Sequence, residues 1–438
     1  MSSELSCVVM SGVDTLRPRS GNPRKHGKKQ IRAIESSIRR FGFLNPILVE
    51  DDGRIVCGHA RWEAARKLGM REVPTLCITH LSADELKAYA LADNKIAERS
   101  SWDNELLAVE FRHLLEVEFD LTLTGFEMPE IDLVLGAAGK AEKDLDEPVV
   151  PPLATAAVSR PGDLWFIGDH RLICGDAQGL AVYERLLMGG CADLVFTDPP
   201  YNLPIDGHVS GLGKHRHREF AFASGEMSRE DFTVFLALVL ACVANMVRDG
   251  AIIYTCMDWR HIREILNAGE LMFGPLKQLC VWNKSNAGMG SFYRSQHELV
   301  FVFKHGKAPH INNFGLGETG RYRTNVWNYP GMSSMSATRD ADLATHPTVK
   351  PVQLVEDAIL DCSNRGDIIL DCFGGSGTTM IAAERAGRRA RLIEIDPLYC
   401  DTIIRRMEQA TGLVARLGDD GPDFAAVAAE RTVMMEAA

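Results

Sequence analysis

Four consecutive residues combine the groups needed to hold a planar ring that carries an amine, namely Asp198, Pro199, Pro200 and Tyr201. They follow an apolar, β-branched and aromatic run at 193–197, which is typical of a buried parallel strand. In open α/β sheets, ligands bind where such strands end. Asp198 and the Pro199 carbonyl can accept N–H bonds from an exocyclic amine while Tyr201 stacks on the ring. An ordinary Pro-Pro turn is the alternative for the tetrapeptide alone.

A second stretch has the pattern of a nucleoside site. Residues 367–371 predict a strand, which is followed by the turn Cys372-Phe373-Gly374-Gly375-Ser376-Gly377-Thr378-Thr379. An Ala-rich helix to Gly387 and another strand at 390–395 come next. The glycines allow close approach of a ligand, and Glu394 at the second strand tip can accept ribose hydroxyls. The turn lacks the G-x-G-x-x-G spacing that cradles a pyrophosphate. A ligand without phosphate, such as S-adenosylmethionine, therefore fits better, with Asp371 near its amino acid moiety.

A third motif, His346-Pro347-Thr348-Val349-Lys350-Pro351, precedes a predicted helix at 352–362. The three motifs together resemble the amino-methylating DNA methyltransferases, which pair an Asp-Pro-Pro-Tyr motif with a Phe-x-Gly-x-Gly cofactor motif. The catalytic motif comes first here, which is the permuted β arrangement of that family. The resemblance covers about 161–409. It implies a Rossmann-like α/β domain that moves a methyl group from S-adenosylmethionine to a base amine in DNA without a metal.

The resemblance also implies roles for individual residues. Asp198, Pro199, Pro200 and Tyr201 are catalytic, and the cofactor is held by Asp371, Phe373, Gly374, Gly375, Ser376, Gly377 and Glu394. Thr348 and Lys350 flank the carboxylate of the cofactor. Asp176, after Gly175, contacts its adenine end, with a plain turn aspartate as the alternative. An aspartate in the catalytic motif goes mainly with adenine N6 and a serine with cytosine N4, so adenine is the expected target and cytosine N4 stays open.

The stretch from Lys304 to Thr345 is expected to recognise the DNA target. Its Arg and Asn side chains can read guanine and adenine edges in double-stranded DNA, with Arg321, Arg323 and Asn325 as candidates. An ordinary surface loop is the alternative. A loop rich in cations and glycine before residue 225 is expected to face phosphates through Lys214, Arg216 and Arg218.

The N-terminal third has a different character. A helix is predicted at 28–41, and Gly58 opens a second helix between short strands. Residues 5–115 resemble the ParB/sulfiredoxin-type domain through Asn22-Pro23-Arg24, Ser37 to Ile47 and Gly58-His59-Ala60-Arg61. The start of the second helix presents free N–H groups beside Gly58, His59, Arg61 and Arg66, and such a site can hold a phosphate. The resemblance also implies a possible nucleotide there, since some members of the family bind one. A DNA-docking accessory domain of α+β fold is the favoured interpretation.

Length and composition set the outer limits. With 438 residues, several domains are expected: 1–135 as the ParB-like domain, 136–160 as a linker, 161–417 as the methyltransferase and 418–438 as a tail. A hydrophobic fraction of 46% supports real cores, and no long apolar run or leader is present, so a cytoplasmic protein without membrane contact is expected. The eleven cysteines show no ligand-like spacing.

The charge distribution of the chain and its functional class leave further interpretations open. The net charge of −11 argues against coating of nucleic acid, yet residues 16–40 hold nine Lys or Arg and a single acid. A homodimer and a restriction-modification setting are open. The rival from another class is a nucleotide-switched DNA-binding protein whose second domain only senses S-adenosylmethionine. The intact Asp198–Tyr201 motif counts against that rival. A methyltransferase of RNA or of small molecules is a third alternative.

Overall fold

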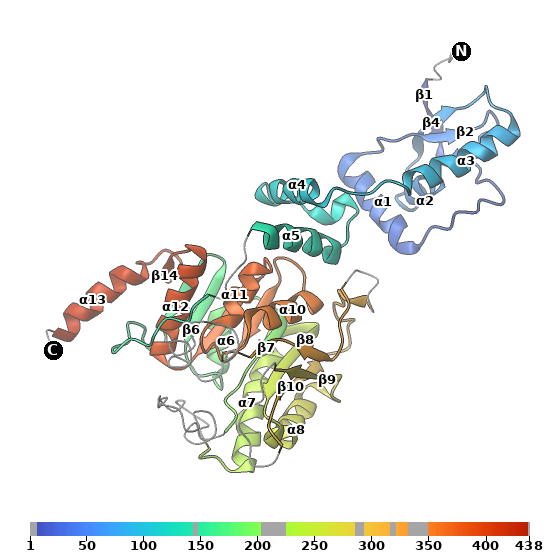
Figure 1. Ribbon diagram of the computed structural model, residues 1–438. Helices are drawn as coiled ribbons and strands as arrows, with labels where there is room; N and C mark the ends of the chain where they lie inside the picture. The colour runs from blue at the N-terminus through green and yellow to red at the C-terminus, as the bar shows by residue number, and fades with distance from the viewer. Residues whose placement is uncertain are drawn as a thin grey trace. The chain divides into compact units, whose positions relative to one another are not determined.

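The computed structural model divides the chain into two compact units, Met1–Glu142 and Lys143–Ala438 (Figure 1). It describes residues 7–142, 148–202, 225–284, 293–315, 321–331 and 349–436. The three loop cations Lys214, Arg216 and Arg218 and the motif residue Thr348 lie outside these ranges.

The first unit contains a four-stranded sheet in the order β1-β4-β2-β3. Its strands are β1 (Val8–Gly12), β2 (Ile47–Val49), β3 (Ile55–Cys57) and β4 (Glu72–Cys77). The central pair β2 and β4 is parallel, and both outer pairings are antiparallel. Apolar side chains of the sheet, among them Ile47, Ile55 and Val73, form a small core together with Val13 of the 3-10 turn that follows β1. The unit is thus of the mixed α+β kind that the sequence predicted.

Helices complete the first unit: α1 (Lys28–Phe41), α2 (His59–Lys67), α3 (Ala83–Ala97), α4 (Asn104–Glu116) and α5 (Met128–Glu142), with 3-10 turns at Val13–Thr15 and Leu121–Thr124. Helix α1 packs on α2 through Ile31, Ala60 and Ala64. Ser82 and Glu85 form a reciprocal capping box that fixes the start of α3. Helices α4 and α5 share a separate apolar cluster around Phe111 and Ile131.

The second unit is built on a ten-stranded sheet in the order β11-β9-β10-β8-β7-β12-β13-β6-β5-β14. The strands are β5 (Leu164–Ile167), β6 (His170–Cys174), β7 (Ala192–Thr197), β8 (Val247–Met257), β9 (Gln278–Asn283), β10 (His297–Lys304), β11 (Val326–Asn328), β12 (Ile368–Asp371), β13 (Arg389–Glu394) and β14 (Ala415–Leu417). The five central strands, β8 to β6 in this order, are parallel. This doubly wound α/β architecture is the predicted one.

Helices cover both faces of this sheet, as Figure 1 shows. They are α6 (Leu180–Leu187), α7 (Arg229–Met246), α8 (Ile262–Phe273), α10 (Val352–Cys362), α11 (Thr378–Arg385), α12 (Pro397–Thr411) and α13 (Phe424–Glu436), with a 3-10 turn at Trp259–His261. Leu194 and Phe196 of β7 join the core under α10 to α12, whereas Val195 joins the core under α6 to α8. This alternation follows from the two-residue period of a strand. Among the described helices, none combines the length and the apolar character that crossing a membrane requires.

The order in which the chain adds strands to the sheet reverses between the parallel neighbours β7 and β12. The chain runs from β7 to the adjacent β8 on one side, and from β12 to the adjacent β13 on the other. Because β7 and β12 are parallel neighbours, their carboxyl ends meet at one rim, which is the position where ligands bind in open α/β sheets. Asp198 directly follows β7, and Asp371 ends β12.

The structure corrects two details of the domain assignment. The predicted linker 136–160 begins inside α5, and its later part packs on the second unit, where Asp401 accepts the backbone N–H groups of Val158 and Ser159 at 2.6 and 2.9 Å. The predicted tail contains α13, whose Phe424 lies edge-on to the buried Trp165 with ring centroids 5.4 Å apart. Sequence composition missed both because a few anchoring contacts, and not a long apolar run, hold these segments.

The substitution F424A tests the docking of α13. Phe424 is 7% exposed, so its removal should lower the free energy of unfolding of the second unit by about 3 kcal/mol through lost burial and a cavity beside Trp165. Urea denaturation followed by tryptophan fluorescence measures the change. The control V414A, at a side chain that is 52% exposed, should stay within about 0.5 kcal/mol of wild type. Equal stability of all three proteins would show that α13 does not stabilise the unit.

Candidate active site

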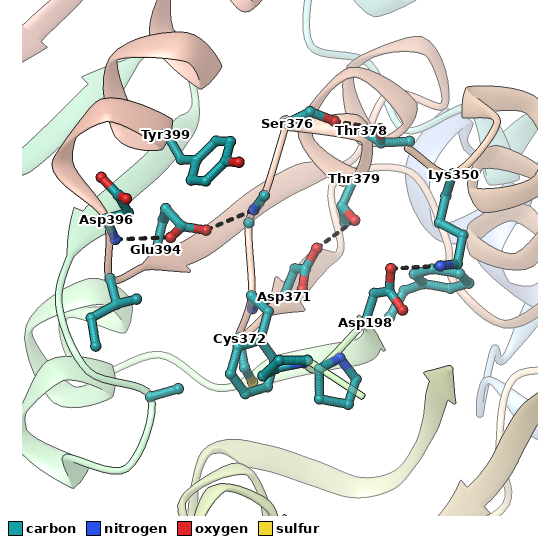
Figure 2. A pocket seen from close by; sticks show the side chains of 18 of the residues that line it. Asp198, Lys350, Asp371, Cys372, Ser376, Thr378, Thr379, Glu394, Asp396 and Tyr399 are labelled. Atoms are coloured by element: carbon teal, nitrogen blue, oxygen red, sulfur yellow. Dashed lines mark hydrogen bonds and ion pairs between the residues drawn. The ribbon is translucent and has the colours of Figure 1, made fainter. Parts of the chain in front are cut away.

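A pocket with a volume of about 220 Å³ opens at the rim where β7 and β12 end (Figure 2). Tyr201 and Phe373, from the two motifs far apart in the sequence, both line it. So do Asp198, Pro199 and Pro200 on one side and residues 372–376 of the glycine turn on the other. The two predicted constellations therefore form a single site.

The glycine turn has a backbone shape that most side chains would disfavour. Gly375 and Gly377 have φ values of 51° and 84°, in the left-handed region. A Cβ atom on Gly374 or Gly377 would come within 3.0 or 3.1 Å of Ile403 on α12. From beneath, the buried guanidinium of Arg406 donates to the Ser376 carbonyl at 3.0 Å. The turn is thus held between a packed helix and the pocket.

Glu394 lies at the tip of β13 and is buried. Its carboxylate accepts the backbone N–H of Gly375 at 2.8 Å and that of Asp396 at 2.9 Å, as the dashed lines in Figure 2 show. Burial raises the pKa of this carboxyl to about 7, although these N–H bonds oppose the shift. A ligand with hydroxyl or positively charged groups would favour the ionised form.

Asp371 is the second buried carboxyl of the pocket. It accepts from the hydroxyls of Thr379 at 2.6 Å and Thr197 at 3.1 Å, and from the N–H of Phe373 at 3.1 Å. Burial raises its pKa to about 7 as well. Thr197 is the last residue of β7, so its hydroxyl ties the end of the catalytic strand to the cofactor turn.

Asp198 lies at the other end of the pocket. Its Oδ1 accepts the Tyr201 hydroxyl at 2.6 Å, and its Oδ2 accepts the Lys350 ammonium at 2.6 Å. Burial raises the pKa of Asp198, while the charge of Lys350 opposes that shift. Each carboxylate oxygen has two lone pairs, so both can accept a further hydrogen bond from a ligand amine.

Lys350 has contacts different from those that the sequence suggested. Its side chain is 5% exposed, and Nζ lies 2.6 Å from Asp198 and 2.9 Å from Glu298 of β10. It therefore faces the catalytic motif, and flanking of a cofactor carboxylate remains a prediction without support from these contacts. Thr348, its predicted companion, lies outside the described residues.

The predicted DNA-reading arginines are held within the protein. Arg321 donates to Asp361 at 2.9 Å and to Asp357 at 3.2 Å, and Arg323 donates to Asp361 at 2.8 Å. These ion pairs, with both guanidiniums largely buried, fix the segment on α10, so direct base recognition by the two arginines is not supported. Asn325 is exposed, next to β11 at the sheet edge.

The remaining predicted residues of the second unit divide into two groups. Asp176 is exposed and lines the pocket, where its Oδ1 accepts the N–H of Gln178 at 2.9 Å. This contact is typical of a turn aspartate, and its position also permits the predicted ligand contact. Lys214, Arg216 and Arg218 lie outside the described residues. Their contact with DNA stays a prediction.

The predicted phosphate-site residues of the first unit lie on or next to α2. Gly58 has a φ of 101°, and a Cβ there would lie 3.1 Å from the Arg61 guanidinium. His59 accepts the N–H of Arg19 at 3.3 Å, whereas the guanidinium of Arg66 lies over the Trp62 ring. Arg61 donates to the Pro46 carbonyl at 3.3 Å. Gly58 and Arg61 therefore lie side by side at the start of α2, and phosphate binding there stays a prediction.

Comparison with known proteins identifies the domains. Residues 192–405 match the DNA methylase family of N6/N4 type. The chain carries a DNA methylase domain. Residues 3–95 match the ParB N-terminal domain, and 105–161 match the ParB-methyltransferase HTH domain. The sequence analysis predicted the first two and missed the third. The methylase assignment supports S-adenosylmethionine as the methyl donor and DNA as the substrate, and it leaves the target base undecided.

Curated DNA methyltransferases and solved structures of such enzymes each match about half of the chain. The type II methyltransferase M.HpaI of Haemophilus parainfluenzae is 28% identical over 257 residues, which are 55% of this chain and 74% of that protein. M2.MboI of Moraxella bovis is 26% identical over 229 residues, 50% of this chain and 81% of the relative. The M1.HpyAVI–SAM complex is 22% identical with a TM-score of 0.40, covering 54% of this chain and 98% of that one. The cytosine-N4-specific PvuII DNA methyltransferase is 16% identical with a TM-score of 0.42, covering 59% and 94%.

The pocket of the methylase domain suits S-adenosylmethionine chemically. The ribose hydroxyls and the ammonium of S-adenosylmethionine are donors, and the buried carboxylates Glu394 and Asp371 are the matching acceptors. Phe373, Ile395 and Tyr399 give the same end of the pocket apolar surface for a planar base. The glycine turn leaves space between these two sets. The residues present therefore fit the methyl donor that the family implies.

Several residues of the site were missed by the sequence analysis. Thr197 and Thr379 bind Asp371, Tyr399 lines the pocket, and Glu298 binds Lys350. Thr197 and Thr379 each adjoin a recognised motif, and their hydroxyls were available as a signal. Glu298 and Tyr399 carried no signal, because only the sheet and helix packing bring them to the rim.

The raised pKa of Glu394 predicts a specific pH dependence of stability. The native carboxyl titrates near 7 and the unfolded one near 4.5, so the native state binds more protons between these values. Its contribution to the free energy of unfolding therefore falls as the pH rises from 4.5 to 7. In E394Q this fall should be absent, so the stability of E394Q relative to wild type should improve by about 3 kcal/mol from pH 4.5 to 8. Urea denaturation at both pH values measures this, and a constant difference would contradict it.

Proposed function

We propose that the protein is a site-specific DNA methyltransferase that moves a methyl group from S-adenosylmethionine to the exocyclic N6 amine of adenine. The observation that carries the proposal is the shared pocket, in which Asp198 and Tyr201 face the glycine turn at one rim of the sheet. The curated relatives are named type II methyltransferases, which agrees with a substrate of this kind. An aspartate at position 198 favours adenine over cytosine, by the family preference described above.

Asp198 acts on the attacking amine. The lone pair of an exocyclic base amine is delocalised into the ring, which makes the nitrogen a poor nucleophile. Hydrogen bonds from its N–H groups to Asp198 and to the Pro199 carbonyl favour a pyramidal nitrogen and stabilise positive charge as it develops there. The Asp198 carboxylate can also accept the proton that the methylated nitrogen must lose.

The other residues of the pocket orient the two reactants. When bound, S-adenosylmethionine supplies an electrophilic methyl group. Glu394 and Asp371 would accept hydrogen bonds from its ribose hydroxyls and its ammonium, and Phe373 and Tyr201 line the same pocket. Holding the amine and methyl in line is worth on the order of 7–11 kcal/mol for well-oriented groups.

The target base must leave the duplex to reach Asp198. Unstacking costs a few kcal/mol, and stacking on the Tyr201 ring offsets part of that cost. Exposed Asn325 and the cations of the loop before residue 225 are the proposed DNA contacts. The ParB-type unit would then serve DNA docking. Nucleotide binding by that unit, a homodimer and a cytoplasmic location stay predictions.

Product analysis tests the function. Purified protein is incubated with labelled S-adenosylmethionine and plasmid, the DNA is digested to nucleosides, and the label should appear in N6-methyladenine. Label in N4-methylcytosine would overturn the assignment of adenine and leave DNA methylation intact. Label in RNA or in small molecules, with none in DNA, would overturn the function itself.

The substitution D198A tests the catalytic assignment. It removes the acceptor for the amine, so the methylation rate should fall at least about 10²–10³-fold. Equilibrium binding of S-adenosylmethionine, measured by calorimetry, should be retained because Glu394 and Asp371 are untouched. D420A, at an exposed acid far along the chain, is the control and should keep wild-type activity. Methylation by D198A at the wild-type rate would show that Asp198 is not catalytic.

A further inference from the structure

Two acids and two lysines alternate at the catalytic end of the pocket. Lys350 lies 2.6 Å from Asp198 and 2.9 Å from Glu298, and Glu298 also binds the ammonium of Lys284. The Tyr201 hydroxyl lies 3.3 Å from Glu298. The side chain of Lys350 is 5% exposed and that of Glu298 is 12% exposed, so solvent screens their interaction little.

The sheet brings Glu298 and Lys284 to this rim. Strand β10 runs antiparallel to β8, so its first residues lie beside the carboxyl end of β8, with Leu299 opposite Met257. Strand β9 is antiparallel to β10 in turn, so Lys284, which follows β9, returns to the same end. The two ammoniums lie over the buried Trp282 ring, at 4.6 Å for Lys284 and 5.8 Å for Lys350.

We propose that Glu298 is a positioning residue of the methylation reaction, which shares the Lys350 ammonium with Asp198 and thereby keeps Asp198 a strong acceptor for the target amine. The inference rests on the proposed function. Neither Glu298 nor Lys284 belongs to the catalytic motif or the glycine turn. They act through Lys350 and need not touch the DNA base or the cofactor.

The physical reason is the division of one positive charge between two carboxylates. Without a charged Glu298, Lys350 would pair with Asp198 alone, and the carboxylate would attract the N–H groups of the base less. The loss of the Glu298 charge would also leave the ammonium of Lys284 uncompensated. The charge of Lys284 would then oppose the positive charge developing on the base nitrogen. Burial raises the pKa of Glu298, but the two ammoniums lower it more, to about 2, so Glu298 is ionised whenever the enzyme works.

The isosteric substitution E298Q tests the proposal. It removes the charge and keeps the shape of the side chain. The value of kcat should fall about tenfold or more, which corresponds to about 1.4 kcal/mol. The KM for S-adenosylmethionine and its equilibrium binding should stay within experimental error of wild type, because Glu394 and Asp371 are unchanged. A merely structural role would instead lower cofactor binding and thermal stability together with kcat.

The double variant K284M/E298Q separates charge balance from folding. It removes the lysine that E298Q leaves uncompensated, so its kcat should lie between those of E298Q and wild type. E264Q is the control: Glu264 is also a little-exposed, ion-paired acid of this unit, but it lies on α8 and pairs with Arg229 and His261 instead of Lys350, so kcat should not change.

Three outcomes would overturn the inference. They are a wild-type kcat in E298Q, a double variant no faster than E298Q, and an equal loss of kcat and cofactor binding. Should E298Q fail to fold, a wild-type kcat in the double variant would overturn it as well. Failure of the proposed function is distinguishable, because the wild-type protein would then transfer no methyl group to DNA.

Discussion

The parallel hydrogen bonding of β7 to β12 is the constraint on which the site depends. Because these strands are neighbours with the same direction, Asp198 after one and Asp371 at the end of the other lie at a single rim. The Thr197 hydroxyl strengthens this link, since it donates to Asp371 and accepts the N–H of Cys372 at 3.2 Å. A shift in the register of either strand would separate the acceptor for the base from the cradle for the methyl donor.

The buried acids of the rim are neutralised in two different ways. At the catalytic end, Asp198 and Glu298 are paired with lysine ammoniums. At the cofactor end, Asp371 and Glu394 are held by hydroxyl and backbone N–H donors, and burial raises the pKa of both to about 7. The first end is thus balanced in charge before substrate arrives. The second gains most from a ligand that carries its own positive charge, which a sulfonium and an ammonium provide.

In the outer parts of the methylase unit, charged side chains that the sequence suggested for DNA recognition form ion pairs within the protein. Arg321 and Arg323 lie in a segment whose composition is typical of DNA recognition. Asp357 and Asp361 on α10 nevertheless bind both side chains within the protein. The same α/β unit gathers segments that composition alone assigned to linker and tail. Asp401 holds the chain at Val158 and Ser159, and Phe424 seals the core beside Trp165.

The sequence by itself determined the order of the units, the two motifs and the strands that carry them, because these depend on local periodicity and on residue types next to each other in the chain. It therefore also predicted Asp198, Tyr201, Asp371 and Glu394 as residues of one pocket. The tertiary structure alone decided that Lys350 faces Asp198, that Glu298 and Lys284 complete the charge network, and that the two arginines are internal. These contacts join antiparallel strands and helices separated by many residues, and a side chain's partner across such a distance is set by sheet order and packing, which local sequence does not encode.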